Sequence, residues 1–464
     1  MNFNPNYAQF EPFNYKTLRD LKNKIKELGL TLPVNSNVEI LKSSLKIEDR
    51  TIPNRLAVQP MEGFDAEIDG SPGELTYRRY KNYAKGGVGL IWFEATAIDF
   101  NCRSNPHQLV LTERNANQFK DLVSSTRKTC NTTLKELGFK SDCTLILQLN
   151  HSGRYSIKNG AKYPIRAYHY HELDNAIGIS EKAGYIISDE DLKKVEDLWV
   201  HKALLAKKVG FDGVDIKSCH GYLIHELLNS RIRKNSIYGG EFLENRARLF
   251  LNIIKKLIQR LNNKKDFLIA TRMSVYDGIP YPYGFGVKSI DNESFPASID
   301  LSEPLELINK LYQLGIRLIN VTAGNPHYKP YVTRPYDTPV RGGEVPNEHP
   351  LYGVNRLIAL EAKIKKKLPL DMVIVGSGYS YLRQFAGFIA AGLIQENSVD
   401  ICGFGRMALA HPNFPKQLFQ EGIIKDKQVC ITCSRCSQFM KMNTHVGCAV
   451  RDPHYKKKSY LSKI

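Results

Sequence analysis

Eight short apolar runs alternate with amphipathic segments along this 464-residue chain, and this alternation restricts the fold more than any other feature. Each run is rich in β-branched residues and hydrophobic on both faces, which is typical of a parallel strand covered by helices. The runs occupy residues 55–61, 88–98, 144–151, 211–217, 267–276, 316–324, 372–379 and 399–407. Eight strands with intervening helices predict an α/β fold, namely a closed (β/α)8 TIM barrel rather than an open sheet.

Seven segments with helical periodicity separate the runs. They occupy residues 74–86, 115–137, 189–209, 243–261, 303–314, 353–367 and 380–391. We expect residues 1–50 to form an N-terminal extension, 51–422 the barrel, and 423–464 a cysteine-rich segment with a basic tail. This extension contains a lysine-rich helix at 15–28 and is expected to cover the bottom of the barrel. An insertion at 278–301, rich in Pro, Gly and Tyr, is expected to form a lid or a wall of the substrate site.

Composition narrows the classes of protein. The net charge is +18, but the excess Lys and Arg lie on separate helix faces, so we do not expect nucleic-acid binding. No apolar run reaches the roughly 20 residues needed to cross a bilayer. The N-terminus has no secretion-signal pattern. We therefore expect a cytoplasmic protein without membrane contact, whose nine cysteines are ligands or core residues rather than disulfides.

Titratable side chains follow the fourth predicted strand. The stretch GFDGVDIKSCHGY, at residues 210–222, predicts a buried strand that leads into a loop carrying Lys217, His220 and Tyr222. The active site of an α/β barrel lies at the C-terminal ends of its strands, so these three side chains are candidates for chemistry. The alternatives are an ordinary loop histidine for His220 and a solvent-exposed lysine for Lys217.

Glycine-rich turns end the last two predicted strands, VGSGYS at 375–380 and GFGRM at 403–407. Barrels commonly bind phosphate with these two loops, through backbone N–H groups at a short helix N-terminus. Arg406 can add a bidentate contact to the anion. One such turn alone would equally suit a plain strand-to-helix connection, whereas two on adjacent strands predict a phosphate site.

Four cysteines in the tail have the spacing of metal ligands. Cys430, Cys433 and Cys436 are each separated by two residues, and Cys448 follows later. This three-plus-one pattern favours a [4Fe–4S] cluster, because one loop can supply three thiolates and a distant cysteine the fourth. A zinc ion bound by four thiolates, or no metal at all, are the alternatives.

The order GVDI, CHGYLIHELL, YGG and LENRARLF closely resembles the Old Yellow Enzyme family of FMN-dependent ene-reductases, and the resemblance covers about residues 45–455. It implies that FMN phosphate is held by Gly376, Ser377, Gly405 and Arg406. The flavin ring would then contact Pro60, Met61, Ala95 (next to Glu94), Gln148 and Arg272, with Gln148 at the pyrimidine edge and Arg272 as the cation near N1 and O2. Glu62 departs from the family pattern, in which a Thr or Cys often faces flavin O4.

The resemblance also implies the chemistry. Hydride would pass from flavin N5 to an activated alkene, with His220 binding the carbonyl group and Tyr222 donating the proton. Lys217 is a second departure, because a cation replaces a neutral donor. His327 resembles a catalytic group of bacterial 2,4-dienoyl-CoA reductase. The expected function is an NADH:flavin oxidoreductase that reduces conjugated carbonyl or dienoyl compounds. The alternatives are an amine dehydrogenase and a non-enzymatic electron relay.

The position of the cysteines after strand eight is similar to that in trimethylamine dehydrogenase and 2,4-dienoyl-CoA reductase, the iron–sulfur branch of this family. Both relatives carry C-terminal dinucleotide-binding domains that this sequence lacks. We therefore expect electrons to come either from NAD(P)H at the barrel mouth or from a one-electron partner such as ferredoxin or flavodoxin.

Overall fold

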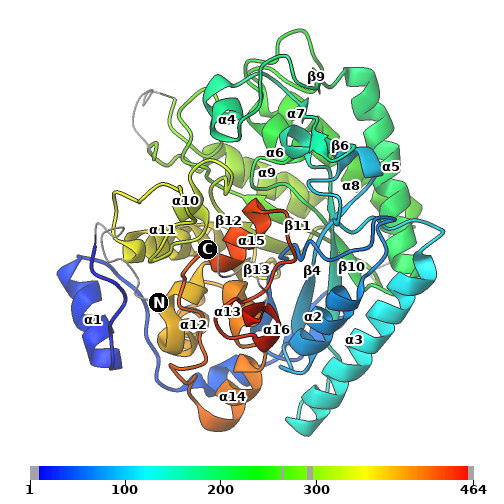
Figure 1. The fold of residues 1–464 in the computed structure, drawn as a ribbon. Coiled ribbons are helices and arrows are strands. Elements are labelled where there is room, and N and C mark those ends of the chain that lie inside the picture. The colour runs from blue at the N-terminus through cyan, green and yellow to red at the C-terminus, as the bar shows by residue number, and fades with distance from the viewer. Residues whose placement is uncertain (1–9, 263–265, 290–295, 458–464) are drawn as a thin grey trace.

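The computed structural model describes residues 10–262, 266–289 and 296–457 and shows a closed barrel of eight parallel strands (Figure 1). The barrel strands are β3 (Leu56–Val58), β4 (Leu90–Ala97), β5 (Thr144–Asn150), β10 (Gly213–Ile216), β11 (Leu268–Ser274), β12 (Leu318–Thr322), β13 (Val373–Gly376) and β14 (Ile401–Phe404). They pair in chain order, and β14 closes the barrel against β3. Each predicted run contains one strand, so the predicted TIM barrel is confirmed.

Side chains of the barrel strands alternate between an inner and an outer cluster. On β4, Leu90 and Trp92 pack inside the barrel, whereas Ile91 and Phe93 belong to the core beneath the outer helices. Phe93 stacks on Tyr80 with ring centroids 3.8 Å apart. Because successive strand residues point to opposite faces, burial on both faces requires the continuous apolar runs seen in the sequence.

Helices surround the barrel. The main ones are α2 (Glu74–Ala84), α3 (Ala116–Glu136), α5 (Asp189–Lys208), α8 (Arg248–Arg260), α9 (Ser302–Gln313), α11 (Pro350–Lys365) and α12 (Ala386–Gln395). The helix expected at 243–261 is divided into α7 (Leu243–Arg246) and α8. The helix expected at 380–391 begins only at α12, because a 3-10 segment (Tyr379–Phe385) precedes it and Arg383 within that segment has a left-handed φ of 51°.

Shorter elements are α4 (His171–Ala176), α6 (Leu223–Leu228), α10 (Pro330–Thr333), α13 (Arg406–Ala410), α14 (Phe414–Glu421), and the strands β6 (Ile157–Lys158), β7 (Ala161–Lys162), β8 (Ile165–Arg166) and β9 (Tyr185–Ile186).

The N-terminal extension covers the barrel bottom through a hairpin rather than through a helix. Strands β1 (Leu45–Ile47) and β2 (Arg50–Ile52) place Ile47 and Ile52 in the inner barrel cluster. Helix α1 (Leu18–Glu27) instead lies at the side of the molecule, near α11 and α12 (Figure 1). The buried residues of this helix, Leu21 and Ile25, pack in the outer core.

The cysteine-rich segment packs against the mouth of the barrel. It contains α15 (Arg435–Lys441) and α16 (Pro453–Lys456), whose Phe439 and Tyr455 form a small cluster with Phe64, just after β3. Part of the 278–301 insertion, residues 290–295, lies outside the described residues. Within the described parts of the chain, no helix is long and apolar enough to cross a membrane.

Candidate active site

The loop after β10 brings three of the four predicted catalytic residues to the barrel mouth, and hydrogen bonds hold it there. His220 has a left-handed φ of 64°, and its N–H donates to Ser274 Oγ at 3.1 Å. The N–H of Gly221 donates to His225 Nδ1 at 3.0 Å. A Cβ on Gly221 would lie 2.3 Å from Asn325 Nδ2, so only glycine fits against the loop after β12.

Lys217, Tyr222 and Glu62 form one buried contact group, although Glu62 comes from the loop after β3. Tyr222 Oη donates to Glu62 Oε1 at 3.2 Å, and Lys217 Nζ lies 3.9 Å from the same oxygen. Lys217 Nζ also lies 3.4 Å from the centre of the Tyr222 ring. Burial raises the pKa of Tyr222, and the Glu62 carboxylate raises it further. Burial lowers the pKa of Lys217, which the Glu62 carboxylate opposes.

Two histidines face this group and are held neutral. His220 Nε2 lies 3.3 Å from Thr322 Oγ1, and burial lowers its pKa well below the usual value. The His327 ring stacks on Tyr155 at 3.9 Å and lies edge-on to Tyr222 at 6.0 Å. Burial, with the Lys217 charge as a smaller cause, lowers the pKa of His327 to about 3. Both imidazoles are therefore suited to hydrogen bonding with a neutral or anionic group.

Tyr155 and Asn325 are site residues that the sequence analysis missed. Asn325 Nδ2 donates to Tyr155 Oη at 2.7 Å and so fixes the Tyr155 ring, on which the His327 ring stacks. Tyr155 follows β5 in the motif HSGRY, and Asn325 follows β12. Their positions directly after strand ends are the only sequence signal that could have identified them.

Arg272 is buried at the mouth without an acidic partner. Its side chain forms no ion pair in the described residues, and its Nε has no hydrogen-bond partner. Burial lowers the pKa of Arg272. The Asp215 carboxylate, which the sequence did not point to, accepts hydrogen bonds from Trp92 Nε1 at 2.8 Å, Gln148 Nε2 at 2.6 Å and the Arg272 backbone N–H. Gln148 is thus oriented at the mouth while the Arg272 guanidinium remains open to a ligand.

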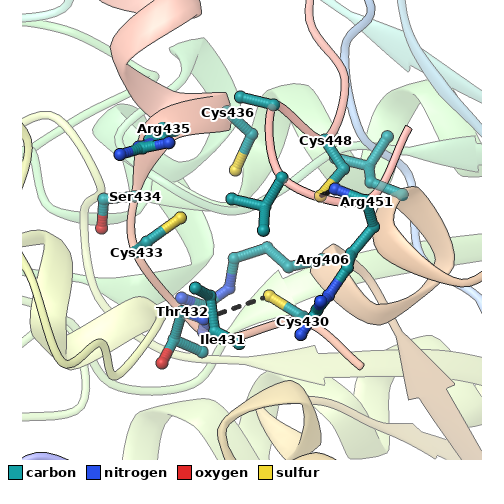
Figure 2. Close-up of a pocket in the computed structure, with 13 residues that line it drawn as sticks. Arg406, Cys430, Ile431, Thr432, Cys433, Ser434, Arg435, Cys436, Cys448 and Arg451 are labelled. Carbon is teal, nitrogen blue, oxygen red and sulfur yellow. Dashed lines mark hydrogen bonds between the residues drawn. The ribbon is translucent and has the colours of Figure 1, made fainter. Parts of the chain in front are cut away.

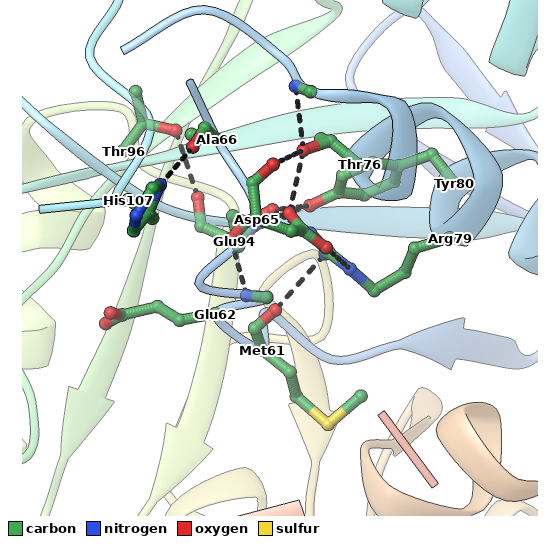
Figure 3. Close-up of polar contacts among 12 residues, drawn as sticks. Met61, Glu62, Asp65, Ala66, Thr76, Arg79, Tyr80, Glu94, Thr96 and His107 are labelled. Carbon is green, nitrogen blue, oxygen red and sulfur yellow. Dashed lines mark hydrogen bonds and ion pairs between the residues drawn. The ribbon is translucent and has the colours of Figure 1, made fainter. Parts of the chain in front are cut away.

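The loop after β3 is fixed by a separate ion network behind it (Figure 3). Arg79 Nη2 lies 2.7 Å from both Asp65 Oδ1 and Glu94 Oε1, and all three side chains are buried. Glu94 also accepts the N–H of Gly63 at 2.7 Å. Burial, opposed by Arg79, raises the pKa of Glu94 to about 7. Glu94 therefore shapes the loop, whereas Glu62 points away from this network (Figure 3).

The remaining residues proposed for the flavin ring lie where β3 and β4 end. Pro60 is buried and Met61 is half-buried, and a Cβ on Gly405 would lie 3.0 Å from Met61 Sδ. Ala95 is buried, and its carbonyl accepts from Gln108 Nε2 at 2.9 Å. The ends of β3 and β14 are thus in contact at the mouth.

The two glycine-rich turns lie side by side, but some of their polar groups already form hydrogen bonds within the protein. Ser377 donates its N–H to Glu361 Oε1 at 2.6 Å and its hydroxyl to Val321 O at 3.0 Å. Glu361, on α11, was not identified from the sequence, and burial raises its pKa to about 8. Next to Ser377, the carbonyl of Gly376 accepts from Gln59 Nε2 at 2.9 Å. Gln59 is therefore a further strand-end residue that the sequence analysis missed.

The four tail cysteines line one pocket together with arginine side chains (Figure 2). Cys430 is buried, and Cys433, Cys436 and Cys448 are half-buried. Arg406 lies in this pocket, where its Nη2 donates to Pro335 O at 2.7 Å and its buried Nη1 has no partner.

The thiols themselves carry raised pKa values. Burial raises the pKa of Cys430 to about 12, which the Arg406 charge opposes, and that of Cys448 to about 11. All nine cysteines are free thiols, and among the described residues no group of three or more possible ligands is arranged around a single ion.

A closed parallel barrel whose strand ends gather Lys217, Tyr222 and Arg272 defines a barrel enzyme with its site at the C-terminal face. The sequence profile of the NADH:flavin oxidoreductase / NADH oxidase family matches residues 41–285. The chain belongs to this family of oxidoreductases, as its resemblance to Old Yellow Enzyme predicted.

Three relatives illustrate the family. An NADH oxidase of Thermoanaerobacter brockii is 24% identical over 84% of this chain and 52% of its own length. An NADH:flavin oxidoreductase of Gibberella zeae is 26% identical, over 81% of this chain and 84% of that protein. An NADPH dehydrogenase of Halalkalibacterium halodurans is 28% identical, over 81% of this chain and 92% of that protein. The chain thus spans about half the length of the first relative and most of the other two.

Solved structures share the fold. The complex of 2-naphthoyl-CoA reductase with 2-naphthoyl-CoA has a TM-score of 0.65 at 19% identity, covering 90% of this chain and 57% of that one. Histamine dehydrogenase from Rhizobium sp. 4-9 has a TM-score of 0.66 at 17% identity, and the match covers 90% of this chain and 53% of that one. Morphinone reductase in complex with tetrahydroNAD has a TM-score of 0.58 at 19% identity, and the match covers 82% of this chain and 90% of that one.

Proposed function

We propose that this chain reduces the C=C bond of an activated alkene, a conjugated carbonyl or dienoyl compound, with FMN as its cofactor. The observation that carries the proposal is the convergence of Tyr222, His220 and His327 beside Lys217 at the barrel mouth. These groups supply a proton donor and neutral hydrogen-bond donors on one side of the barrel mouth.

The residues present fit FMN. Arg272, a buried guanidinium that forms no ion pair with the described residues and whose Nε has no hydrogen-bond partner, suits the polar pyrimidine edge of a flavin. Gln148, which donates to Asp215, would contact the same edge. Pro60, Met61, Glu62 and Ala95 would line the ring, and Gly376, Ser377, Gly405 and Arg406 the phosphate. When bound, FMN would supply the hydride for the alkene.

Each side chain at the mouth then has a specific task. His220 and His327, both neutral, donate hydrogen bonds to the electron-withdrawing group of the substrate. Tyr222 protonates the α-carbon. Lys217 places a positive charge beside Tyr222, where it favours an anionic or carbonyl substrate and repels a substrate ammonium.

Flavin content and substrate turnover test this proposal. The purified protein is expected to be yellow, to release FMN, and to reduce enones or dienoyl thioesters anaerobically. A protein that takes up no FMN contradicts the proposal. Reduction of the bound flavin by an amine, without NAD(P)H, would instead support an amine dehydrogenase such as the histamine dehydrogenase whose fold it shares. Electron transfer to dyes without alkene reduction would indicate a relay.

The role of Tyr222 has its own test. Tyr222→Phe is expected to slow reoxidation by an alkene by roughly 10²–10⁴-fold, because the proton donor is lost. Flavin reduction by the donor is expected to stay near the wild-type rate in stopped-flow measurements. Equal slowing of both half-reactions would mean that Tyr222 has a structural role.

We also propose that Cys430, Cys433, Cys436 and Cys448 bind a [4Fe–4S] cluster. The support is that all four thiols line one pocket with Arg406, whose positive charge opposes the rise in the pKa of Cys430. Iron and acid-labile sulfide analysis of anaerobically purified protein tests this. About four irons per chain are expected, whereas one zinc and no iron would identify a structural site.

The electron donor follows from the cofactors. With a cluster, the chain would exchange single electrons with a ferredoxin or flavodoxin, and without one it would take hydride from NAD(P)H. A cytoplasmic location suits either donor. Anaerobic reduction by NADH, NADPH and reduced ferredoxin, measured side by side, distinguishes them.

A further inference from the structure

His225 lies on α6 and has no task in the proposed reaction, but it is bonded to the loop that carries the reacting groups. Its Nδ1 accepts the N–H of Gly221 at 3.0 Å. Gly221 stands between His220 and Tyr222 in the loop after β10. Because the His225 side chain is buried, this hydrogen bond is shielded from water. His225 therefore acts on the candidate active site through the backbone of its loop.

The turn that His225 contacts is conformationally demanding. His220 has a left-handed φ of 64°, and Gly221 follows with a φ of 75°. A non-glycine residue in this region is strained and keeps its conformation only where the surrounding structure fixes it. Both backbone N–H groups of the turn donate to side chains, that of His220 to Ser274 Oγ and that of Gly221 to His225 Nδ1. These two hydrogen bonds hold the turn in its strained shape.

The hydrogen bond from Gly221 also fixes the tautomer of the imidazole. A ring nitrogen that accepts an N–H carries no proton, so the proton of a neutral His225 is on Nε2. Nε2 lies 3.9 Å from Asp277 Oδ2, which is beyond hydrogen-bond range. A charged imidazolium would set two N–H donors against each other at Gly221. Burial prevents this by lowering the pKa of His225 to about 3.

Packing alone does not explain a histidine at this position. Among the residues that the structure describes, His225 Nε2 has no hydrogen-bond partner, and the ring meets Phe285 edge-on at a centroid distance of 6.3 Å. A polar group that is buried without a partner destabilises the fold. A leucine would avoid this cost in the same surroundings. The contact that uses the polarity of the imidazole is the hydrogen bond from Gly221.

Asp277 fixes the helix of His225 against the insertion after β11. Its Oδ1 accepts the N–H of Ile279 at 3.0 Å. Its Oδ2 accepts the N–H of Phe285 at 3.1 Å and Nδ2 of Asn229, at the end of α6, at 2.9 Å. All of these groups are buried. The imidazole is thus held in one place relative to the turn.

We infer that His225 is a positioning residue, which holds the turn that sets His220 and Tyr222 relative to each other. The inference rests on the proposed alkene reduction, in which His220 binds the electron-withdrawing group and Tyr222 protonates the α-carbon. One substrate must make both contacts at the same time. A displacement of the turn by about 1 Å should therefore slow the reaction roughly 10²-fold.

Two substitutions separate positioning from packing. His225→Leu removes the acceptor for the Gly221 N–H, whereas His225→Asn supplies an amide oxygen close to the position of Nδ1. Bound FMN is photoreduced without oxygen, and its reoxidation is followed after rapid mixing with an enone or with dioxygen. We expect His225→Leu to slow the enone reaction roughly 10²-fold and His225→Asn to recover most of this loss. The dioxygen reaction, which uses neither His220 nor Tyr222, should slow much less.

His349 offers a matched control. It is buried, its Nδ1 accepts the N–H of Leu351 at 3.1 Å, and among the described residues its Nε2 also has no hydrogen-bond partner. Its ring faces Phe10 and Glu11 of the N-terminal extension rather than the candidate active site. His349→Leu should therefore lower the Tm about as much as His225→Leu does, without slowing the enone reaction.

Three results would overturn the inference while the proposed function stands. These are an unchanged enone rate in His225→Leu, equal slowing of the enone and dioxygen reactions, and a loss that His225→Asn does not recover. A slower enone reaction in His349→Leu at a similar Tm would also overturn it, because loss of stability would then be sufficient. Failure of the wild-type protein to reduce any enone would instead reject the proposed function.

If His225→Leu does not fold, the tautomer of His225 in the wild-type protein decides. NMR of the FMN-bound protein with isotope-labelled histidine reports which ring nitrogen carries the proton, and His225→Asn assigns the signal. We expect a neutral ring with its proton on Nε2 at neutral pH. A proton on Nδ1 would overturn the inference, because such a ring cannot accept the N–H of Gly221.

Discussion

Two buried arginines at opposite sides of the barrel mouth differ in their partners. Arg79 lies between Asp65 and Glu94 at 2.7 Å from each, behind the loop after β3. Arg272 is 8% exposed and forms no ion pair in the described residues. The first charge is satisfied within the protein and fixes a loop, whereas the second is left available at the end of β11.

The difference shows how this fold divides structural from functional charge. A buried charge costs several kcal/mol of desolvation unless partners compensate it. Arg79 has that compensation in the protein alone. Arg272 obtains compensation only from a bound group, so its desolvation lowers the stability of the fold until that group binds. Exchanging the two arginines for apolar residues should therefore affect stability and cofactor binding differently.

Removal of the Arg79 guanidinium should give the largest loss of stability. In Arg79→Leu, Asp65 and Glu94 remain buried without a cation, so the free energy of unfolding should fall by about 3–5 kcal/mol. Urea denaturation monitored by circular dichroism measures this, with exposed Arg114→Leu as the control. A loss below about 1 kcal/mol, as for a surface pair, would mean that the network contributes little.

Arg272→Leu should weaken FMN binding rather than the fold. A hydrogen bond to a charged group contributes about 1.5–3 kcal/mol, so the Kd for FMN should rise roughly 10–100-fold. The free energy of unfolding without FMN should not decrease. Fluorescence titration of the apoprotein measures the Kd, and Arg272→Lys should recover part of the affinity. Lower apoprotein stability in Arg272→Leu would show that the guanidinium has a partner within the protein.

Glu361 should make stability depend on pH. Its pKa rises from 4.5 to about 8 on folding because it is buried without a close cation. The native state therefore holds a proton that the unfolded state releases, so stability is highest in acid and falls as the pH rises toward 8. The slope contributed by this group is at most about 1.4 kcal/mol per pH unit. Glu361→Gln should flatten the profile between pH 5 and about 8, and an unchanged slope would exclude Glu361 as its source.

The Arg78–Asp452 pair should show the smallest effect. It joins α2 to the tail with two hydrogen bonds of 2.7 and 2.8 Å, but the Arg78 side chain is 35% exposed. Exposed pairs contribute about 0–1 kcal/mol. Arg78→Ala should therefore lower the free energy of unfolding by no more than about 1 kcal/mol, and a loss comparable to that of Arg79→Leu would remove the contrast between buried and exposed pairs.

Much of the architecture could be predicted because it depends on periodicity. The eight strands bury both faces, and such runs stand out along the chain. The strand-end residues Lys217, His220 and Tyr222 could be placed at the mouth for the same reason. The contact of Glu62 with Tyr222 could not, because the two residues are 160 positions apart and meet only through the closure of the barrel.

Other site residues lacked any local signal. Glu361 lies on an amphipathic helix, where a single inward-facing acid looks like any other polar residue. Asp215 lies within an apolar strand, and its role depends on Trp92 from β4 and Gln148 from β5. The surface against which helix α1 packs had no sequence signal, because amphipathicity shows that a helix packs, but not against which surface.

The left-handed Arg383 has a consequence for how the protein is assembled. Its guanidinium contacts Asp337, the carbonyl of Phe13 in the N-terminal extension, and the carbonyl of Ile431 between Cys430 and Cys433. One side chain thus ties the first and last parts of the chain to each other. The position of the cysteine loop therefore depends on Arg383 and, through this side chain, on the N-terminal extension.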